Sequence, residues 1–412
     1  MSLVVQKYGG TSVADPDRLK AVAGHIVATR RAGHDVVVVV SAMGKTTDEL
    51  EQLAHQVSAL PAPREMDMLL TAGERISISL LCMAIIDQGE HAVSFTGSQA
   101  GILTDTFHQK AKILDVRAER LRDAVGAGSV AVVAGFQGVS TAADITTLGR
   151  GGSDTTAVAL AAALDAEVCE IYTDVEGVFT ADPRVVVDAR RLDRVSYEEM
   201  LDMAATGGRV LALRSVEFAR NYEVPLHVRS SFGWGPGTWV GPDAAWDTEK
   251  DTAMEQAIIS GVTHDISEAK VTISQVPDRP GVAARVFRAL ADESVNVDMI
   301  VQNVSSAGHT DISFTVPRSE LRSALKVVEK VSGEVEATGF AHDDSIGRVS
   351  LVGAGMKTNP GVAATMFETL SDVGINIEMI STSSIRISCV VQEADVTRAV
   401  QVLHEAFELG GA

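Results

Sequence analysis

Short apolar runs and segments with helical spacing alternate along the first 230 residues or so of the chain. The run at 35–40 includes five consecutive valines, which is typical of a strand buried on both faces. Apolar runs predict strands at 3–5, 35–40, 92–95, 130–135, 167–173 and 225–229. Helical spacing predicts helices at 17–31, from 48 into the eighties, and at 154–164. This alternation predicts an α/β domain whose mostly parallel sheet is sandwiched by helices.

The last third of the chain repeats itself. The segment Asn296-Val297-Asp298-Met299-Ile300 recurs as Asn376-Ile377-Glu378-Met379-Ile380, and Pro280-Gly281-Val282-Ala283 recurs 80 positions later. Each copy has the pattern βαββαβ, which predicts a small two-layer sandwich of the ferredoxin-like kind. The later strands are expected at 311–316 and 385–391, and the later helices at 319–331 and 394–407.

A turn-rich stretch from Ser231 to Gly237 separates the two patterns. We therefore expect a first domain at 1–245, a linker at 246–264, and the repeats at 265–345 and 346–412.

Composition excludes several classes of protein. Hydrophobic residues make up 46% of the 412 residues, and the formal net charge is −20, which disfavours nucleic acid and acidic membranes as partners. Cys82, Cys169 and Cys389 are widely spaced in apolar segments, so we expect buried thiols rather than disulfides or a metal site. The sequence shows neither a secretion signal nor an apolar run of membrane-spanning length, so we expect a cytoplasmic protein without a membrane partner.

A lysine and two glycines lie where the first strand passes into the first helix. Gly9 and Gly10 let the backbone approach a phosphate closely, with free N–H groups and the positive end of a helix dipole directed at it. Lys7 adds a full charge. A tight turn with a surface lysine is the alternative for this segment alone.

Two further clusters follow strands. Gly149-Arg150-Gly151-Gly152-Ser153-Asp154 precedes an alanine-rich helix, and its arginine could bind a carboxylate through two hydrogen bonds. Thr173-Asp174 ends a strand and suits a nucleoside. Ordinary turns with surface charge are the alternative for each, but ligands of open parallel sheets bind at the carboxyl ends of strands, where all three clusters lie.

The sequence lacks two common phosphate-binding motifs. Gly44-Lys45-Thr46 resembles the end of a P-loop, but Val39 stands where the first glycine is required. In the dinucleotide fingerprint, Asp154 replaces the last glycine.

The motifs KYGGTS, SAMGKTTDEL, GERIS, LGRGGSDTTA and YTDVEGVFTADPR, in this order, resemble those of the aspartate kinases. The duplicated C-terminal unit resembles the paired ACT domains that regulate these enzymes. The likeness is strongest to monofunctional, lysine-sensitive members, and it implies the amino-acid kinase fold. The implied activity transfers the γ-phosphoryl group of ATP, with Mg²⁺, to the β-carboxylate of L-aspartate.

The resemblance also implies roles for individual residues. Lys7 and Asp154 would be catalytic, and the ATP contacts would be Lys7, Tyr8, Gly9, Gly10, Ser41, Thr173, Asp174, Phe179, Asp182, Arg184 and Arg209. Aspartate would be bound by Thr47, Glu74, Arg150, Gly151, Gly152 and Ser153. Glu74 suits the α-ammonium and Arg150 the α-carboxylate. Phe179 and Arg209 stand where many relatives have tyrosine and lysine.

The resemblance to ACT domains implies lysine and threonine as feedback inhibitors, bound between ACT units of neighbouring chains in an oligomer. The first effector pocket would comprise Asp278, Pro280, Gly281, Val282, Ala283, Asn296, Val297, Asp298 and Gln302. The second would comprise Val362, Ala363, Asn376, Ile377, Ser383 and Ser384. The asparagines could instead be ordinary turn residues.

Three alternatives stay open from the sequence. Met254 could start a separate regulatory subunit, which would make the oligomer heteromeric, or it could be a packing residue. The enzyme could be another acyl-phosphate-forming amino-acid kinase, such as an acetylglutamate kinase, although Glu74 would then lack an ammonium partner. The chain could also be a non-catalytic amino-acid sensor.

Overall fold

The computed structural model describes residues 2–242, 258–303, 308–354, 356, 359 and 361–411, and Met254 lies outside them. The chain divides into two compact units. The first contains 1–178, 191–205 and 209–252, and the second contains 179–190, 206–208 and 253–412. The chain thus passes between the units several times instead of crossing once near residue 245.

An eight-stranded sheet forms the centre of the first unit. Its strands pair in parallel except β11 with β12, which are antiparallel. In spatial order they are β10 (Arg194–Ser196), β12 (Thr238–Gly241), β11 (Leu226–Ser230), β9 (Val168–Thr173), β1 (Leu3–Tyr8), β2 (Asp35–Val40), β6 (Val130–Ala134) and β3 (Ala92–Phe95). The mostly parallel α/β sheet predicted from the sequence is confirmed.

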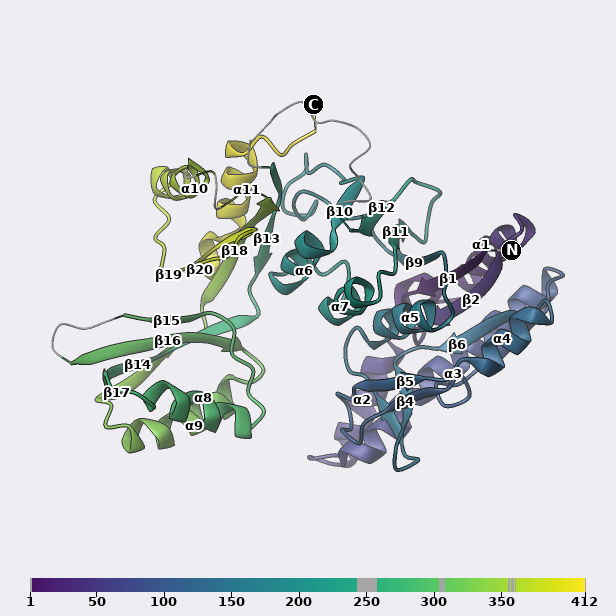
Figure 1. Ribbon diagram of the computed structural model, residues 1–412, viewed down its shortest axis with the longest axis horizontal. Coiled ribbons are helices and arrows are strands. Elements are labelled where there is room, and N and C mark those ends of the chain that lie inside the picture. The colour runs from purple at the N-terminus through teal and green to yellow at the C-terminus, as the bar shows by residue number, and fades with distance from the viewer. Residues whose placement is uncertain are drawn as a thin grey trace. The chain divides into compact units, whose positions relative to one another are not determined.

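Helices cover both faces of this sheet (Figure 1). They are η1 (Gly10–Val13), α1 (Pro16–Arg31), α3 (Pro63–Asp87), α4 (Glu119–Gly126), α5 (Gly152–Ala163) and α6 (Tyr197–Ala205), whereas α2 (Thr46–Val57) packs on α3, and α7 (Leu213–Asn221) packs on α5 and α6. The single helix expected from 48 into the eighties is wrong, because Pro61 and Pro63 interrupt it and Pro63 starts α3. A small second sheet, which the sequence did not indicate, contains β5 (Ile113–Val116), β4 (Ile102–Thr104), β7 (Gln137–Ser140) and β8 (Ile145–Thr147).

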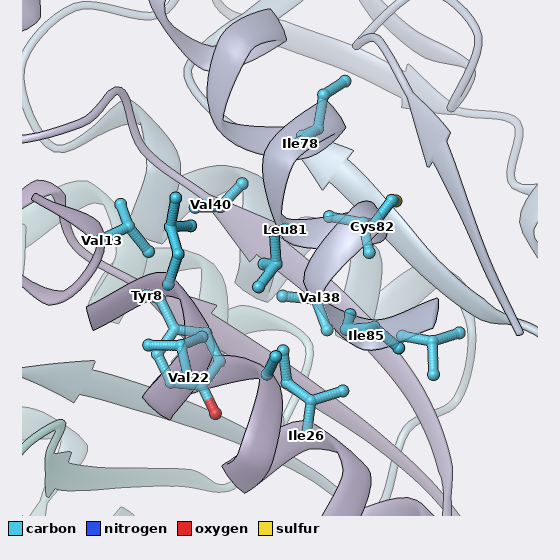
Figure 2. Packing of buried hydrophobic residues seen from close by; sticks show 14 of the residues in the cluster. Tyr8, Val13, Val22, Ile26, Val38, Val40, Ile78, Leu81, Cys82 and Ile85 are labelled. Carbon is cyan, nitrogen blue, oxygen red and sulfur yellow. The ribbon is translucent and has the colours of Figure 1, made fainter. Parts of the chain in front are cut away.

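Alternation along the strands decides which side chains face which helices. Val36, Val38 and Val40 join Tyr8 in a core with α1 and α3 (Figure 2). Lys7 points to the opposite face, where α5 crosses β1, β2 and β9. By length and composition α3 could cross a membrane, but half of its apolar stretch is buried in this unit, as in the core helix of a globular domain.

The second unit contains the two repeats, each a four-stranded antiparallel sheet. The first sheet has the order β15 (Ile300–Gln302), β16 (His309–Pro317), β14 (Glu268–Pro277) and β17 (Gly339–Asp343). The second has the order β13 (Ile258–Asp265), β18 (Ile346–Ala354), β20 (Arg386–Gln392) and β19 (Met379–Thr382). Residues 258–264, expected in a linker, therefore form most of a strand of the second repeat, and the first repeat is inserted into the second.

Each repeat packs two helices on one face of its sheet (Figure 1). These are α8 (Val282–Asp292) and α9 (Leu321–Glu334) in the first repeat, and α10 (Gly361–Asp372) and α11 (Val396–Ala406), preceded by η3 (Glu393–Asp395), in the second. Ala181 and Val186 from the segment Phe179–Arg190 join the core of the second repeat. This explains why that segment belongs to the second unit.

Candidate active site and candidate effector cavity

The carboxyl ends of five parallel strands lie at one edge of the large sheet. Tyr8 is paired with Val40 on one side and Tyr172 on the other, so β1, β2 and β9 end level with one another. The strands β6 and β11 continue the same edge. The glycine turn after β1, Ser41 after β2 and Asp174 after β9 are therefore brought together, as the rule for ligands of parallel sheets predicts.

Lys7 forms an ion pair with Asp154 at this edge. Its Nζ lies 2.7 Å from Oδ1 of Asp154, and the two side chains are only 11% and 12% exposed. Asp154 lies in the first turn of α5, so the ion pair sits beside the positive end of a helix dipole. Gly151 precedes this turn with φ of 75°, a conformation that favours glycine. The arrangement places a fixed cation and N–H donors where an anion can bind.

At Gly10 and Gly135 the backbone lies so close to neighbouring atoms that only glycine fits. A Cβ atom on Gly10 would lie 2.8 Å from the carbonyl oxygen of Ala42, so the turns after β1 and β2 touch through main-chain atoms. A Cβ atom on Gly135, after β6, would lie 2.6 Å from Oγ of Ser153. The Ser41 hydroxyl donates to this same oxygen at 3.0 Å. The ends of β2 and β6 thus both contact Ser153 at the start of α5, and the turn after β1 packs on the turn after β2.

Glu74 is a buried carboxylate with one oxygen unused. Oε1 accepts a hydrogen bond from the Ala42 N–H at 3.2 Å, and Oε2 has no hydrogen-bond partner among the residues that the structure describes. Burial raises the pKa of Glu74 to about 7, although two backbone hydrogen bonds oppose the shift. Gly73 lets α3 approach this loop, since a Cβ there would lie 2.7 Å from that of Ala42. A cation such as an ammonium group would satisfy the free oxygen.

Two of the other residues expected to bind aspartate are Thr47 and Arg150. Thr47 lies half-buried in the first turn of α2, next to Thr46, whose methyl group would be 3.5 Å from a Cβ on Gly73. Arg150 is exposed on the turn before α5. Binding of aspartate by Thr47 and Arg150 stays a prediction.

The residues expected to contact the nucleotide divide between the units. Thr173 donates to Asp174 at 3.1 Å at the edge just described, and Arg209 also belongs to the first unit. Phe179, Asp182 and Arg184 belong to the second. The Arg184 side chain donates three hydrogen bonds to the Asp182 carboxylate, and these are the main cause of the lowered pKa of Asp182. Their assignment to ATP stays a prediction.

A buried polar network beneath the site escaped the sequence analysis. Glu170 accepts hydrogen bonds from Gln6 at 2.8 Å, Arg229 at 3.0 Å and Tyr172 at 3.1 Å. Burial favours the neutral carboxyl, but contacts with His227, Gln6 and Arg229 outweigh it and lower the pKa of Glu170 to about 2. The signal available in the sequence was a charged residue inside each of two apolar strands, β9 and β11.

A cavity of about 340 Å³ opens in the first repeat at the start of α8. The predicted effector residues Asp278, Pro280, Gly281, Val282, Ala283 and Gln302 line it. Asn296, Val297 and Asp298 are not among the lining residues. Asn296 instead donates to Glu320 through its N–H at 2.8 Å, and the Asp298 carboxylate pairs with Arg348 of the second repeat.

All six residues of the second predicted pocket lie among the residues that the structure describes. Val362 is buried in α10, and Ala363 and Ile377 pack against the same core. The Ser383 N–H donates to the Arg386 carbonyl at 2.8 Å, which closes the turn that contains Ser384. Asn376 precedes β19. Effector binding by these residues stays a prediction.

Known proteins match the whole chain. The amino acid kinase family matches residues 2–230, and the ACT domain matches 271–331 and 349–407. An aspartokinase from Mycolicibacterium smegmatis is 59% identical over 414 residues, which cover 100% of this chain and 97% of the relative. The crystal structure of E. coli aspartokinase III with aspartate and ADP (R-state) is 25% identical with a TM-score of 0.82, and covers 98% of this chain and 99% of that one. The same enzyme with lysine and aspartate (T-state) has a TM-score of 0.73 at the same identity and coverage.

Proposed function

The chain belongs to the aspartokinase family, the ATP-dependent kinases that phosphorylate aspartate, and we propose that the edge around Lys7 and Asp154 is where the phosphoryl group is transferred. The observation that carries this proposal is their ion pair beside the glycine turn and the start of α5. The γ-phosphoryl group of ATP would meet the β-carboxylate of L-aspartate there, giving 4-phospho-L-aspartate.

The chemistry requires placement and charge neutralisation. A carboxylate is already ionised at neutral pH, so no general base is needed to activate it. The site must hold two anions in line and offset the charge that spreads over the transferred group. Lys7, oriented by Asp154, and the N–H group of Gly10 can do this without reorganisation, whereas the Gly9 N–H already donates to the Tyr172 carbonyl at 3.4 Å.

Glu74 and Arg150 are proposed to hold the amino-acid head. The free Oε2 of Glu74 would accept the α-ammonium, and Arg150 would bind the α-carboxylate, leaving the β-carboxylate to attack. An acetylated amine would leave Glu74 without a charged partner. This favours aspartate over acetylglutamate, and the intact Lys7–Asp154 pair disfavours a purely sensing role.

Mg²⁺ fits this site as a companion of the nucleotide. Among the described residues, no three His, Cys, Asp or Glu side chains gather as a metal cluster, so phosphate oxygens would be its main ligands. The ion would neutralise charge on the triphosphate. Asp174 is the exposed carboxylate at the strand ends that could assist in holding it.

One assay tests the proposed activity. Release of ADP is measured with aspartate, glutamate and acetylglutamate as acceptors at matched concentrations. We expect rapid turnover with aspartate alone. Equal or faster turnover with acetylglutamate, or none with any acceptor, would contradict the proposal.

We propose that the cavity at the start of α8 binds the feedback effector. Gly281, with φ of 93°, immediately precedes the helix, and the N–H groups of Ala283 and Ala284 in the first turn can receive an amino acid's carboxylate, whereas that of Val282 donates to the Arg279 carbonyl at 3.5 Å. Family membership favours lysine and threonine as effectors, bound in an oligomer that shifts between two states. The oligomer could be homomeric, or heteromeric if translation also starts at Met254, and we expect the enzyme in the cytoplasm.

Filling the cavity should relieve inhibition. Ala283→Leu adds three carbon atoms to its lining, and we expect the lysine and threonine concentrations for half-inhibition to rise about tenfold, the effect of losing about 1.4 kcal/mol of binding. Ala291→Leu, on the exposed side of the same helix, is the matched control. Unchanged inhibition of a folded Ala283→Leu enzyme would exclude the cavity as the effector site.

A further inference from the structure

Asp67 is a fully buried carboxylate on α3 that the proposed chemistry does not use. It accepts hydrogen bonds from the Thr147 hydroxyl at 2.6 Å and from the Gln109 N–H at 3.1 Å, and it pairs with Nδ1 of His108 at 2.6 Å. Thr147 ends β8, immediately before the turn that carries Arg150. Asp67 therefore ties α3 to this turn.

The Arg214 side chain of α7 binds main-chain carbonyl groups next to the same turn. It donates to the carbonyl oxygens of Leu148 at 3.1 Å and Ala111 at 2.8 Å. The Ala111 N–H in turn donates to the Thr147 carbonyl at 3.0 Å. A Cβ atom on Gly149 would lie 2.9 Å from the Gln109 carbonyl, so the turn also packs directly on the segment that Asp67 binds.

The geometry points to Asp67 and Arg214 as positioning residues, which set the place of Arg150 relative to Glu74 and so adjust the site to the head of the amino-acid substrate. Asp67 and Glu74 are two turns apart on one helix, about 10.5 Å along its axis. A single rigid helix thus carries the proposed ammonium acceptor and anchors the proposed carboxylate binder. The inference rests on the proposed role of Arg150.

A purely structural role would predict a different outcome. Burying a carboxylate is costly, and apolar residues of similar size would stabilise a core at least as well. A positioning role predicts a selective loss of affinity for one substrate, because small displacements of a binding group have large effects. A structural role predicts a loss of stability that is shared by both substrates.

The test compares Asp67→Asn and Arg214→Gln with the parent enzyme. We expect KM for aspartate to rise about tenfold or more while KM for ATP stays within about twofold. Arg214→Lys, which keeps a donor, should recover part of the loss. Arg122→Gln is the matched control, because Arg122 also donates to a carbonyl, that of Ala163, at the far end of α5.

Equal changes in both KM values, or a lower melting temperature with KM for aspartate unchanged, would overturn the inference. Arg150→Ala separates this failure from that of the proposed function. If Arg150→Ala raises KM for aspartate but Asp67→Asn and Arg214→Gln do not, only the positioning role is wrong. If Arg150→Ala has no effect, the proposed role of Arg150 fails as well.

Two crossed ion pairs carry a second, independent inference. In the first repeat the Asp298 N–H donates to the Thr315 carbonyl, and Thr315 is paired in register with Lys270. In the second, the Glu378 N–H donates to Val390, which is paired with Arg348. Asp298 and Glu378 are therefore equivalent positions, and so are Lys270 and Arg348.

The side chains pair across the repeats rather than within them. Asp298 binds Arg348 of the second repeat, and Glu378 binds Lys270 of the first. The Arg348 side chain is only 2% exposed and also lies 3.0 Å from Glu268. Met299 and Met379, which follow the two acids, meet in one apolar cluster between the sheets. A shift of either acid therefore breaks an ion pair with the other repeat, although Arg348 would keep Glu268.

We infer that this reciprocal pairing transmits effector binding from the cavity of the first repeat to the second, an inference that rests on the proposed effector site. Hydrogen exchange with saturating lysine or threonine tests it. We expect protection of α10 and β19, loss of that protection in Glu378→Gln, and recovery in the swapped variant Lys270→Glu with Glu378→Lys. Protection that persists in Glu378→Gln would overturn the inference, whereas no protection of α8 in the parent enzyme would refute the effector site itself.

Discussion

Replacing Lys7 with alanine is expected to lower kcat about a hundredfold or more, the scale of losing one preorganised electrostatic donor. The substitution removes the cation at the strand ends and leaves Asp154 facing an incoming phosphoryl group. Steady-state rates of ADP release with aspartate measure the effect. The melting temperature is expected to fall as well, because the largely buried Asp154 loses its ion-pair partner, so the rates are compared at a temperature at which the variant is folded.

Two variants control this experiment. Lys20→Ala removes an exposed lysine from α1 and should leave kcat unchanged. Lys7→Arg keeps the charge with a different geometry and should recover only part of the rate. Near-normal kcat in a folded Lys7→Ala enzyme would remove Lys7 from its proposed role.

The second large effect is expected at Glu74 and depends on pH. Only the ionised carboxylate can bind an ammonium group, and the pKa of Glu74 is raised to about 7 by burial. We therefore expect kcat/KM for aspartate to fall about tenfold for each pH unit below 7. Glu74→Gln should lower kcat/KM for aspartate by about thirtyfold or more at pH 8, the loss of a charged hydrogen bond, and should abolish this dependence on pH. If kcat/KM of Glu74→Gln still falls below pH 7 as in the parent enzyme, the fall must come from the titration of another group.

The same shift makes a prediction for stability. Because the pKa of Glu74 rises from 4.5 in the unfolded chain to about 7, the folded state binds the proton more tightly. The contribution of Glu74 to the free energy of unfolding is therefore fully present below pH 4.5 and is lost as pH rises to about 7. The free energy of unfolding, measured with denaturant at pH 5 and at pH 8, should differ less between the two pH values in Glu74→Gln than in the parent enzyme. Identical differences would contradict the shift.

Much of the architecture could be predicted because its signals are local. The valine run of β2 and the alanine-rich α5 have patterns that specify a buried strand and a buried helix without reference to the rest of the chain. The small sheet of β4, β5, β7 and β8 was missed, since strands of three or four residues carry too little periodicity to be recognised. The strand β13 was missed because its partner, β18, lies beyond an entire inserted repeat.

The sequence by itself determined the family, the α/β class, the duplication and the order of the motifs, because each depends on residue types at short spacing. Only the tertiary structure decided which motifs meet. Glu74 is a candidate ammonium acceptor because Gly73 lets α3 approach Ala42, which buries one carboxylate oxygen without a partner. Asp298 was expected in the effector pocket, yet it binds Arg348, 50 residues away. Such pairings follow from packing between distant segments, which local patterns do not encode.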